Sequence, residues 1–273
     1  MFPAARLSPV SQIRLLRYAE DVDEISCAAV YAHANEVLDL CASPTNAALI
    51  ATVYDDFSGP GARCTVWRMP DLPAADAVFD RGATGTAPEP PTRELERVAD
   101  VPLMKDAAGA GSDAVARVAW APHVSGHVPT SFVTAHGACV RAWSLSAAGG
   151  VEPAGAAAFD APAPHVGAVA WDPHHASQVA VAAGAAVYSW DLRVGERARA
   201  IEHAVQAGCG VVRALSFNPN RPWVLATAGD DFRVKIWDLR KPAAPLKVLE
   251  GHSHWCVKTG CRSNRCVTCA HRC

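Results

Sequence analysis

The chain has 273 residues, of which 50% are hydrophobic, so it is long enough to bury a substantial core. Its formal net charge of −2 and pI of about 6.6 exclude a general electrostatic attraction to nucleic acid or to anionic lipid. The longest apolar run, Val179–Tyr188, is about half as long as a membrane span must be, and we interpret it as a buried strand.

The N-terminal part of the chain, residues 1–72, contains one strand and the first copy of a repeated pattern. The Arg- and Ser-containing start without acids resembles a transit peptide, but we interpret residues 12–18 as a strand because the resemblance described below implies one there. After His33, an apolar strand ends in a turn at Pro44, a second strand covers 49–54, and a third carries Trp67. Short apolar strands separated by turn residues indicate an all-β protein.

Residues 73–112 interrupt this pattern. The stretch is rich in Ala, Pro, Gly and charged residues, which indicates a mostly disordered linker inserted between two copies. A short helix at 92–98 is compatible with its Glu, Leu and Arg content. Gly109, Gly111 and Ala114 match GxGxxA, but no strand precedes the match and no helix follows it, so it does not indicate a nucleotide site.

Three further copies of the pattern lie within residues 113–255. In each, two apolar strands precede a third strand that ends in Trp143, Trp190 or Trp237. The last two intervals between these tryptophans are 47 residues each, close to one WD unit, whereas the interval from Trp67 to Trp143 is 76 because of the linker. A Gly-His dipeptide ending at His252 opens a fifth unit.

These copies predict an all-β fold, a WD-repeat β-propeller that is incomplete and has about four to five recognisable blades. Each blade is a four-stranded antiparallel sheet covered on both faces by its neighbours, so its inner strands should be almost continuously apolar. In WD repeats a His, a Ser or Thr, an Asp and the third-strand Trp form a hydrogen-bonded set. The fourth copy supplies Thr227, Asp230 or Asp231, and Trp237, whereas the third has only Ala and Gly at the turn.

The tail, residues 256–273, is rich in Cys and does not continue the repeat, and we expect it to lack strand alternation. Cys266 and Cys269 have the CxxC spacing of a zinc knuckle, and further donors lie at Cys261, His271 and Cys273. A structural zinc site usually separates two ligand pairs by a loop of about a dozen residues, but these donors are crowded together. We predict no metal and no cofactor, and interpret the tail as an alternative or out-of-frame C-terminus. Zinc binding is the other interpretation.

No catalytic motif accompanies the repeats. The sequence contains no GxxxxGK[ST], HExxH or GxSxG, and Lys and Arg do not cluster with aromatic residues as RNA binding requires. His123, His174 and His175 follow the first strand of their copies and are expected to be solvated loop residues. We therefore predict that the chain is not an enzyme and has no nucleic-acid partner.

Six longer motifs are more specific than the general repeat. They are HANEVLDLCASP (33–44), TVWRMPDL (65–72), WDPHH (171–175), ALSFNPN (214–220), AGDDFRVKIWDLR (228–240) and GHSHW (251–255). Together they resemble the family of WD-repeat proteins that interact with the endosome-associated recycling and Golgi-associated retrograde tethering complexes. The resemblance covers residues 12–255 apart from the linker.

The resemblance implies a non-enzymatic scaffold that binds tethering-complex subunits and thereby supports endosomal recycling and retrograde transport to the trans-Golgi network. It implies a cytoplasmic protein, peripheral at the trans-Golgi network and endosomes, with no direct membrane insertion. It also implies a seven-bladed ring, which needs more than about 300 residues. We therefore expect the chain to be truncated at both ends.

Two WDLR motifs, at 190–193 and 237–240, leave a second function open. In one interpretation their Asp residues cap turns and their Arg residues are ordinary surface groups. In the other, Arg193 and Arg240 dock onto the adaptor of a cullin-RING ubiquitin ligase, for which the chain would be a substrate receptor. A pull-down separates these functions, because the first retains tether subunits and the second retains the adaptor.

Overall fold

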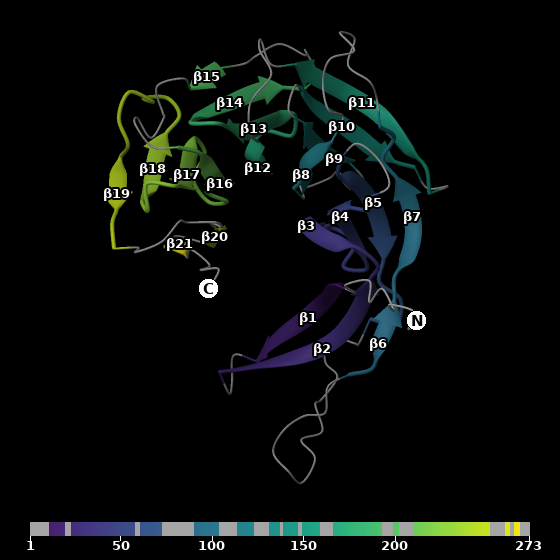
Figure 1. Ribbon diagram of the computed structural model, residues 1–273. Helices are drawn as coiled ribbons and strands as arrows, with labels where there is room; N and C mark the ends of the chain where they lie inside the picture. Colours follow the sequence, from purple (N-terminus) through teal and green to yellow (C-terminus); the bar gives the residue numbers. More distant parts are fainter. Residues whose placement is uncertain are drawn as a thin grey trace, which may run out of the picture.

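The computed structural model describes residues 11–19, 23–57, 61–72, 90–103, 114–122, 131–136, 139–146, 149–158, 166–192, 199–201, 210–251, 260–262 and 265–267. Within these ranges all helical or extended secondary structure is β-strand, and no helix is present. The strands form four four-stranded sheets, one three-stranded sheet and one two-stranded sheet, which follow one another around an open arc (Figure 1). The prediction of an incomplete β-propeller is confirmed.

Each four-stranded sheet is one blade, and its first strand lies on the inner side of the arc (Figure 1). Blade 1 contains β1 (Ser11–Ala19) and β2 (Glu24–His33), joined by β6 (Thr92–Glu94). Blade 2 contains β3 (Glu36–Ala42), β4 (Leu49–Asp55), β5 (Arg63–Arg68) and β7 (Glu96–Asp100). Blade 3 contains β8 (Val115–Trp120), β9 (Ser131–His136), β10 (Cys139–Leu145) and β11 (Val151–Ala158).

The remaining sheets continue the arc. Blade 4 contains β12 (Val166–Trp171), β13 (Gln178–Ala183), β14 (Ala186–Asp191) and β15 (Arg199–Ile201). Blade 5 contains β16 (Val212–Phe217), β17 (Val224–Gly229), β18 (Val234–Asp238) and β19 (Lys247–Leu249). A hairpin of β20 (Gly260–Arg262) and β21 (Arg265–Val267) follows, with β20 near β16. The tail therefore contains a short two-stranded hairpin although its sequence shows no strand alternation.

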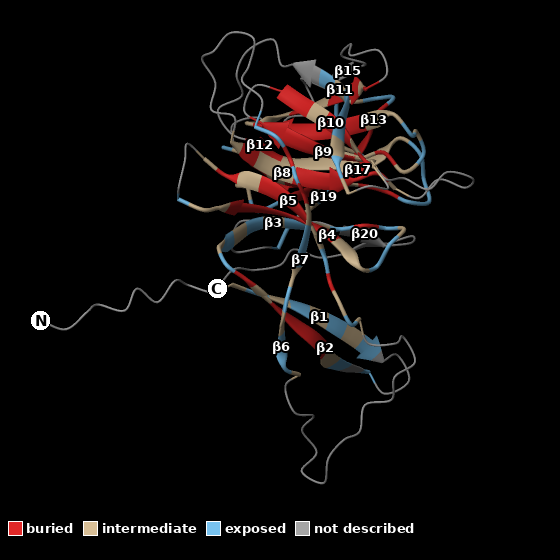
Figure 2. Cartoon of the chain, turned by 90° about the vertical axis from the view of Figure 1, so that its right-hand side faces the viewer, coloured by how far each residue is buried: buried red, intermediate tan, exposed pale blue. Residues whose placement is uncertain are grey.

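The second strands of the blades are the most deeply buried elements. In β9, β13 and β17, five consecutive residues are buried, because side chains on both faces of the strand meet a neighbouring sheet. The β13 sequence is QVAVAA and the β17 sequence is VLATAG, so apolar runs replace the alternation of a half-exposed strand. Figure 2 shows this burial as a red layer through the middle of the arc.

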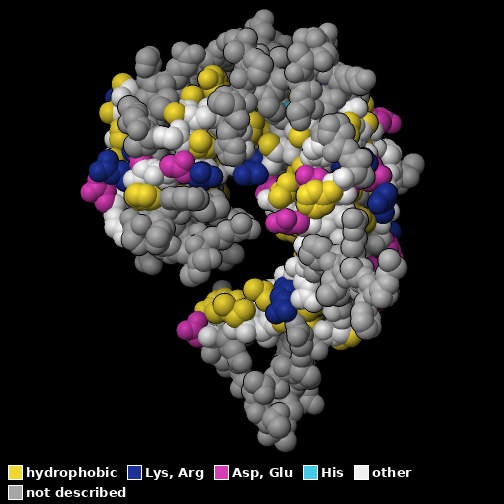
Figure 3. Space-filling model, in the orientation of Figure 1, with side chains coloured by type: hydrophobic (Ala, Val, Ile, Leu, Met, Phe, Trp, Pro, Cys, Tyr) yellow, Lys and Arg dark blue, Asp and Glu magenta, His cyan; other side chains and the backbone are white. Residues whose placement is uncertain are grey.

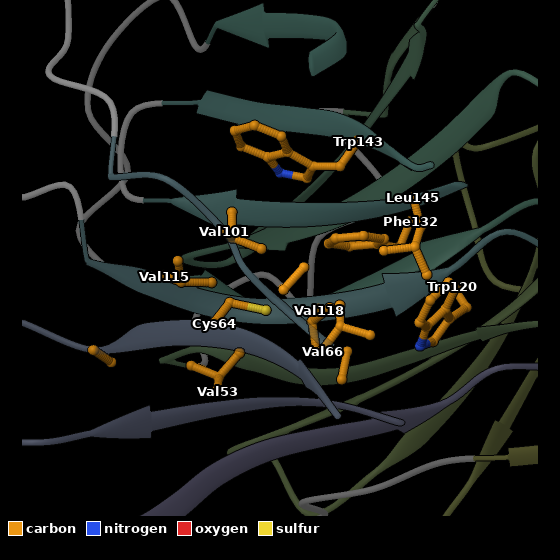
Figure 4. Close-up of a cluster of buried hydrophobic side chains, with 13 residues drawn as sticks. Val53, Cys64, Val66, Val101, Val115, Val118, Trp120, Phe132, Trp143 and Leu145 are labelled. Atoms are coloured by element: carbon orange, nitrogen blue, oxygen red, sulfur yellow. The ribbon is translucent and has the colours of Figure 1, made fainter. Parts of the chain in front are cut away.

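The largest apolar core lies between blades 2 and 3. Figure 4 shows its side chains gathered between the two sheets; they include Val53, Cys64 and Val66 on one side and Phe132 and Trp143 on the other. Full burial of a side chain of this size contributes about 1.5–3 kcal/mol, so these contacts are the main attachment of one blade to the next. Burial also raises the pKa of the Cys64 thiol, with Asp39 adding to the effect, so the thiol stays protonated and inert.

Polar contacts between inner strands fix the register of neighbouring blades. The Asp39 carboxylate on β3 accepts a hydrogen bond from the Val118 amide on β8 at 3.0 Å. The Trp120 indole nitrogen donates to the Cys41 carbonyl at 3.1 Å. These two hydrogen bonds between β3 and β8 fix the position of blade 3 relative to blade 2 along the strand direction. Apolar packing alone would allow the two sheets to slide.

The backbones of blades 4 and 5 approach each other closely at Gly167 on β12. A Cβ added at this residue would lie 1.9 Å from the Val212 carbonyl oxygen of β16. Arg117 of blade 3 donates to the Gly167 carbonyl at 2.7 Å, so one residue contacts both neighbouring blades. The position requires glycine because the approach is backbone to backbone.

The segment 90–103 corrects the sequence interpretation. The linker and short helix expected there are replaced by β6 and β7, and β7 is the outer strand of blade 2, which therefore extends to Asp100. Asp100 accepts a hydrogen bond from Thr65 at 2.8 Å, and the Arg97 guanidinium lies over the Trp67 ring. These tertiary contacts override the helix preference of Glu, Leu and Arg. The rest of the linker, 73–89 and 104–112, lies outside the described residues.

The face of blade 1 that points away from blade 2 is apolar and exposed. Leu15 packs toward blade 2, whereas Leu16, after an irregularity in the β1–β2 register, lies on the exposed face. Tyr18 and Ile25 pair across β1 and β2 and are also more than half exposed. Exposed apolar surface of this kind favours association.

Candidate functional site

The four tryptophans of the repeat occupy the third strand of blades 2 to 5. Trp143, Trp190 and Trp237 are buried, and Trp67 is partly buried. Each tryptophan lies opposite an apolar residue of the second strand. The position at which the WD repeat is expected to have Ser or Thr lies two residues after that apolar residue. The repeat therefore places one indole at the same point of every blade.

Three of these four indoles donate to a threonine on the neighbouring strand. The acceptors are Thr52 for Trp67, Thr134 for Trp143 and Thr227 for Trp237, with a nitrogen–oxygen distance of 2.8 Å in each blade. The indole N–H groups have hydroxyl partners inside the sheet, so burial leaves them satisfied. In blade 4 the equivalent position is Val181, and Trp190 instead stacks on Tyr188.

Histidine completes the set in blade 2. The His33 Nδ1 lies 2.9 Å from the Asn35 carbonyl and 3.3 Å from the Asn35 amide, so a protonated Nδ1 donates to the carbonyl and an unprotonated one accepts from the amide. The other nitrogen, Nε2, lies 3.2 Å from the Thr52 hydroxyl, and Thr52 accepts from Trp67. Burial lowers the pKa of His33, only partly offset by the hydrogen bond with Asn35, which favours the neutral imidazole.

In blade 3 the imidazole comes from a different place in the repeat. His136, two residues after Thr134 on the same strand, has its Nε2 2.9 Å from the threonine hydroxyl. The sequence at the end of this strand is Ala-His-Gly, without the Asp of a typical WD turn. The structure shows that the same imidazole–hydroxyl–indole contact is made from the end of the second strand instead of from the residue before the first.

In the turn of blade 5, both Asp230 and Asp231, which the sequence left as alternatives, form ion pairs. Asp231, whose side chain is 4% exposed, pairs with Lys235 at 3.0 Å and accepts from the Arg233 amide. Asp230 pairs with Arg213 and accepts from the Val211 amide. The turn is therefore joined to β16 by one aspartate and to β18 by the other.

The second WDLR motif forms a rigid surface pair. The Asp238 carboxylate accepts from Nε and a terminal nitrogen of Arg240 at 2.9 and 2.7 Å, and from the Arg240 amide. This pairing lowers the pKa of Asp238 to about 2. The Arg240 side chain remains 63% exposed, so the guanidinium is both oriented and accessible.

Sequence reasoning missed a polar network between blades 4 and 5. His174 Nε2 donates to the Asn218 carbonyl at 2.9 Å, and His175 Nδ1 lies 2.9 Å from the buried Asp172 carboxylate. The His175 ring packs against Trp223. Both histidines lie in the loop after β12, as expected, and His174 is exposed while His175 is partly buried. Their contacts with blade 5 were not expected. Their sequence signal, WDPHH, gives no hint of the partner loop.

Other expected site residues cannot be placed. Arg193, His252 and His123 lie outside the described residues, as do the tail side chains, Cys261, Cys266, Cys269, His271 and Cys273. In the ranges that are described, no three His, Cys, Asp or Glu side chains are arranged to hold a metal ion. No helix in those ranges is long and apolar enough to cross a membrane.

Comparison with known proteins agrees with this architecture. A family model described as the EIPR1 beta-propeller matches residues 4–267. The chain belongs to this family. The bounds of the EIPR1 match include the linker and the first part of the Cys-rich tail.

Individual relatives cover most of the chain. It is 30% identical to the EARP and GARP complex-interacting protein 1 of Rattus norvegicus and 29% identical to the EARP-interacting protein homolog of Gekko japonicus, each over 90% of the chain. It is 26% identical to the WD repeat-containing protein DWA2 of Arabidopsis thaliana over 93% of the chain. It spans 61%, 60% and 64% of these relatives' lengths, respectively.

Proposed function

We propose that the chain is a non-enzymatic scaffold that binds subunits of the endosome-associated recycling and Golgi-associated retrograde tethering complexes. By this binding it supports endosomal recycling and retrograde transport, at the cytoplasmic surface of endosomes and the trans-Golgi network. Membership of the EIPR1 family carries the proposal, because the rat relative is named for its interaction with both complexes. The fold agrees: hydrogen-bonded Trp–Thr pairs hold the sheets rigid, and the turns between strands remain available for partners.

A pull-down with purified tethering-complex subunits tests this function. The chain is immobilised beside the rat relative, which serves as the matched positive control. We expect both baits to retain the same subunits. Retention by the rat protein but not by the chain, at equal loading and with the chain shown to be folded, would contradict the proposal.

A second function rests on Arg240. Its guanidinium is exposed and oriented by Asp238, as a docking group for a ligase adaptor should be. If the chain is a substrate receptor of a cullin-RING ligase, it retains the adaptor, and Arg240→Ala abolishes that retention while Arg240→Lys weakens it. Retention of tether subunits without the adaptor favours the first function.

A further inference from the structure

Two turns of the propeller carry the same three residues, Asp-Asp-Phe. Asp55–Phe57 begins at the last residue of β4 in blade 2, and Asp230–Phe232 follows β17 in blade 5. Each begins three residues after the threonine that accepts from the blade tryptophan, Thr52 or Thr227. The two phenylalanines therefore occupy corresponding positions after the second strand, although the turn of blade 2 is longer, with β5 beginning at Arg63 and β18 at Val234.

Both phenylalanines are held in an unfavourable backbone conformation. The φ angles are 54° at Phe57 and 60° at Phe232, in the left-handed region that favours glycine. Phe57 is 78% exposed and Phe232 is 39% exposed, so burial does not compensate for the strain at Phe57. The Asp55 carboxylate accepts from the Phe57 amide at 2.8 Å and fixes the turn. A strained, exposed aromatic side chain on a fixed turn suggests a role outside folding.

The charges around the two turns differ. Glu36 pairs directly with Asp55 across β3 and β4, which places two carboxylates beside each other. In the described part of the chain neither of them has a cationic partner, whereas the next residue, Asp56, pairs with Arg63 at 3.0 Å. We call Glu36, Asp55, Asp56 and Phe57 the Phe57 corner.

The turn that carries Phe232 is electrically balanced. Its aspartates pair with Arg213 and Lys235, and the following Arg233 pairs with Glu250 at 3.0 Å. Figure 3 shows one face of the arc, on which acidic and hydrophobic side chains adjoin near β3, and acidic and basic side chains adjoin near β18. The Phe232 turn is thus a control within the same chain, because it has the left-handed φ and both of its aspartates have cationic partners.

We propose that the Phe57 corner is a docking point for a partner protein, which binds there through a segment that contains both basic and aliphatic side chains. An aliphatic side chain of the segment covers the Phe57 ring, and a Lys or Arg beside it pairs with Glu36 and Asp55, which relieves their mutual repulsion. The negative charge disfavours an anionic lipid surface or a nucleic acid at this corner. The inference rests on the proposed scaffold function, because it assigns the contact point for such a partner.

The test uses a fluorescently labelled peptide of alternating leucine and lysine, with two control peptides in which glutamate replaces lysine or serine replaces leucine. Fluorescence polarisation with the full chain should detect only the leucine–lysine peptide, and added salt should weaken its binding. Phe57→Gly should weaken binding by roughly fivefold or more, the loss expected for a central interface residue. Glu36→Gln should also weaken it, whereas Phe57→Trp should retain it.

Phe232→Gly is the control for backbone effects. Both glycine variants relieve a left-handed φ, so each should keep or raise the thermal unfolding midpoint, but only Phe57→Gly should lose peptide binding. Equal losses in the two variants, equal binding of the glutamate peptide, or no binding to the wild-type chain would overturn the inference.

The tether pull-down separates this inference from the proposed function. If wild type and Phe57→Gly retain the subunits equally, the corner is not the contact point, but the scaffold function stands. If the peptide binds at the corner and no subunit is retained, the scaffold's named partners are wrong, but the docking corner stands.

Discussion

Replacing Thr227 with Val tests what the repeated tryptophans contribute to the fold. Thr227 accepts the Trp237 indole N–H at 2.8 Å, and both side chains are almost completely buried. Val keeps the shape and strand preference of Thr but removes the acceptor. The indole N–H is then buried without a hydrogen-bond partner. The free energy of unfolding should fall by about 1–3 kcal/mol. Trp237→Ala, which also removes a large buried ring, should cost about 3–5 kcal/mol.

A double-mutant cycle isolates the hydrogen bond from the packing. Trp237→Phe removes the donor, so the Thr227→Val change should cost less in that background, by about 1 kcal/mol. Urea denaturation followed by far-ultraviolet circular dichroism gives the four unfolding free energies. Thr92→Val, on the exposed face of β6, is the matched control and should change stability by less than about 0.5 kcal/mol. A coupling energy of zero, or equal effects at Thr227 and Thr92, would refute the reasoning.

Three other outcomes follow from the geometry. Gly167→Ala should destabilise the chain by about 1–3 kcal/mol or more in the same denaturation assay, because the new methyl group overlaps the Val212 carbonyl; unchanged stability would mean that the two strands are further apart. Folding lowers the pKa of Asp238 to about 2, so the pairing with Arg240 stabilises the fold above the ordinary Asp range and is lost as the pH falls through about 2. An NMR titration of Arg240→Ala should show the Asp238 pKa returning upward, and no change would exclude the pairing in solution. Ile25→Lys should reduce concentration-dependent association in size-exclusion chromatography, whereas an unchanged elution profile would show that the exposed face of blade 1 is not responsible.

The sequence was sufficient to predict the inner part of each blade. Trp143, Trp190 and Trp237 mark strands whose neighbours are apolar because both sheet faces are covered, and this requirement is visible as a pattern. The Thr227–Trp237 contact was predictable as well, since both residues occupy fixed places in the repeat. Local composition and periodicity carry this information without knowledge of the neighbouring blade.

Contacts between elements distant in sequence were not predictable. The 92–98 segment has helical composition, and only its pairing with β2 and β5 makes it a strand. His136 and His174 find their partners through the geometry of a turn and of a neighbouring loop, which no spacing rule encodes. The left-handed φ of Phe57 is equally hidden, because a sequence pattern leads one to expect glycine at such a position.

The strand pair β6–β7 changes how the propeller comes apart. One continuous stretch, 92–100, is hydrogen-bonded first to β2 of blade 1 and then to β5 of blade 2, with only Leu95 between the two ladders. Neighbouring blades elsewhere in a repeat array can open one after another, because each interface breaks separately. Here the outer strand of blade 2 cannot peel away without loosening blade 1. Amide hydrogens in these two blades should exchange with solvent at a common rate, as one cooperative unit, while blades 4 and 5 exchange independently of them.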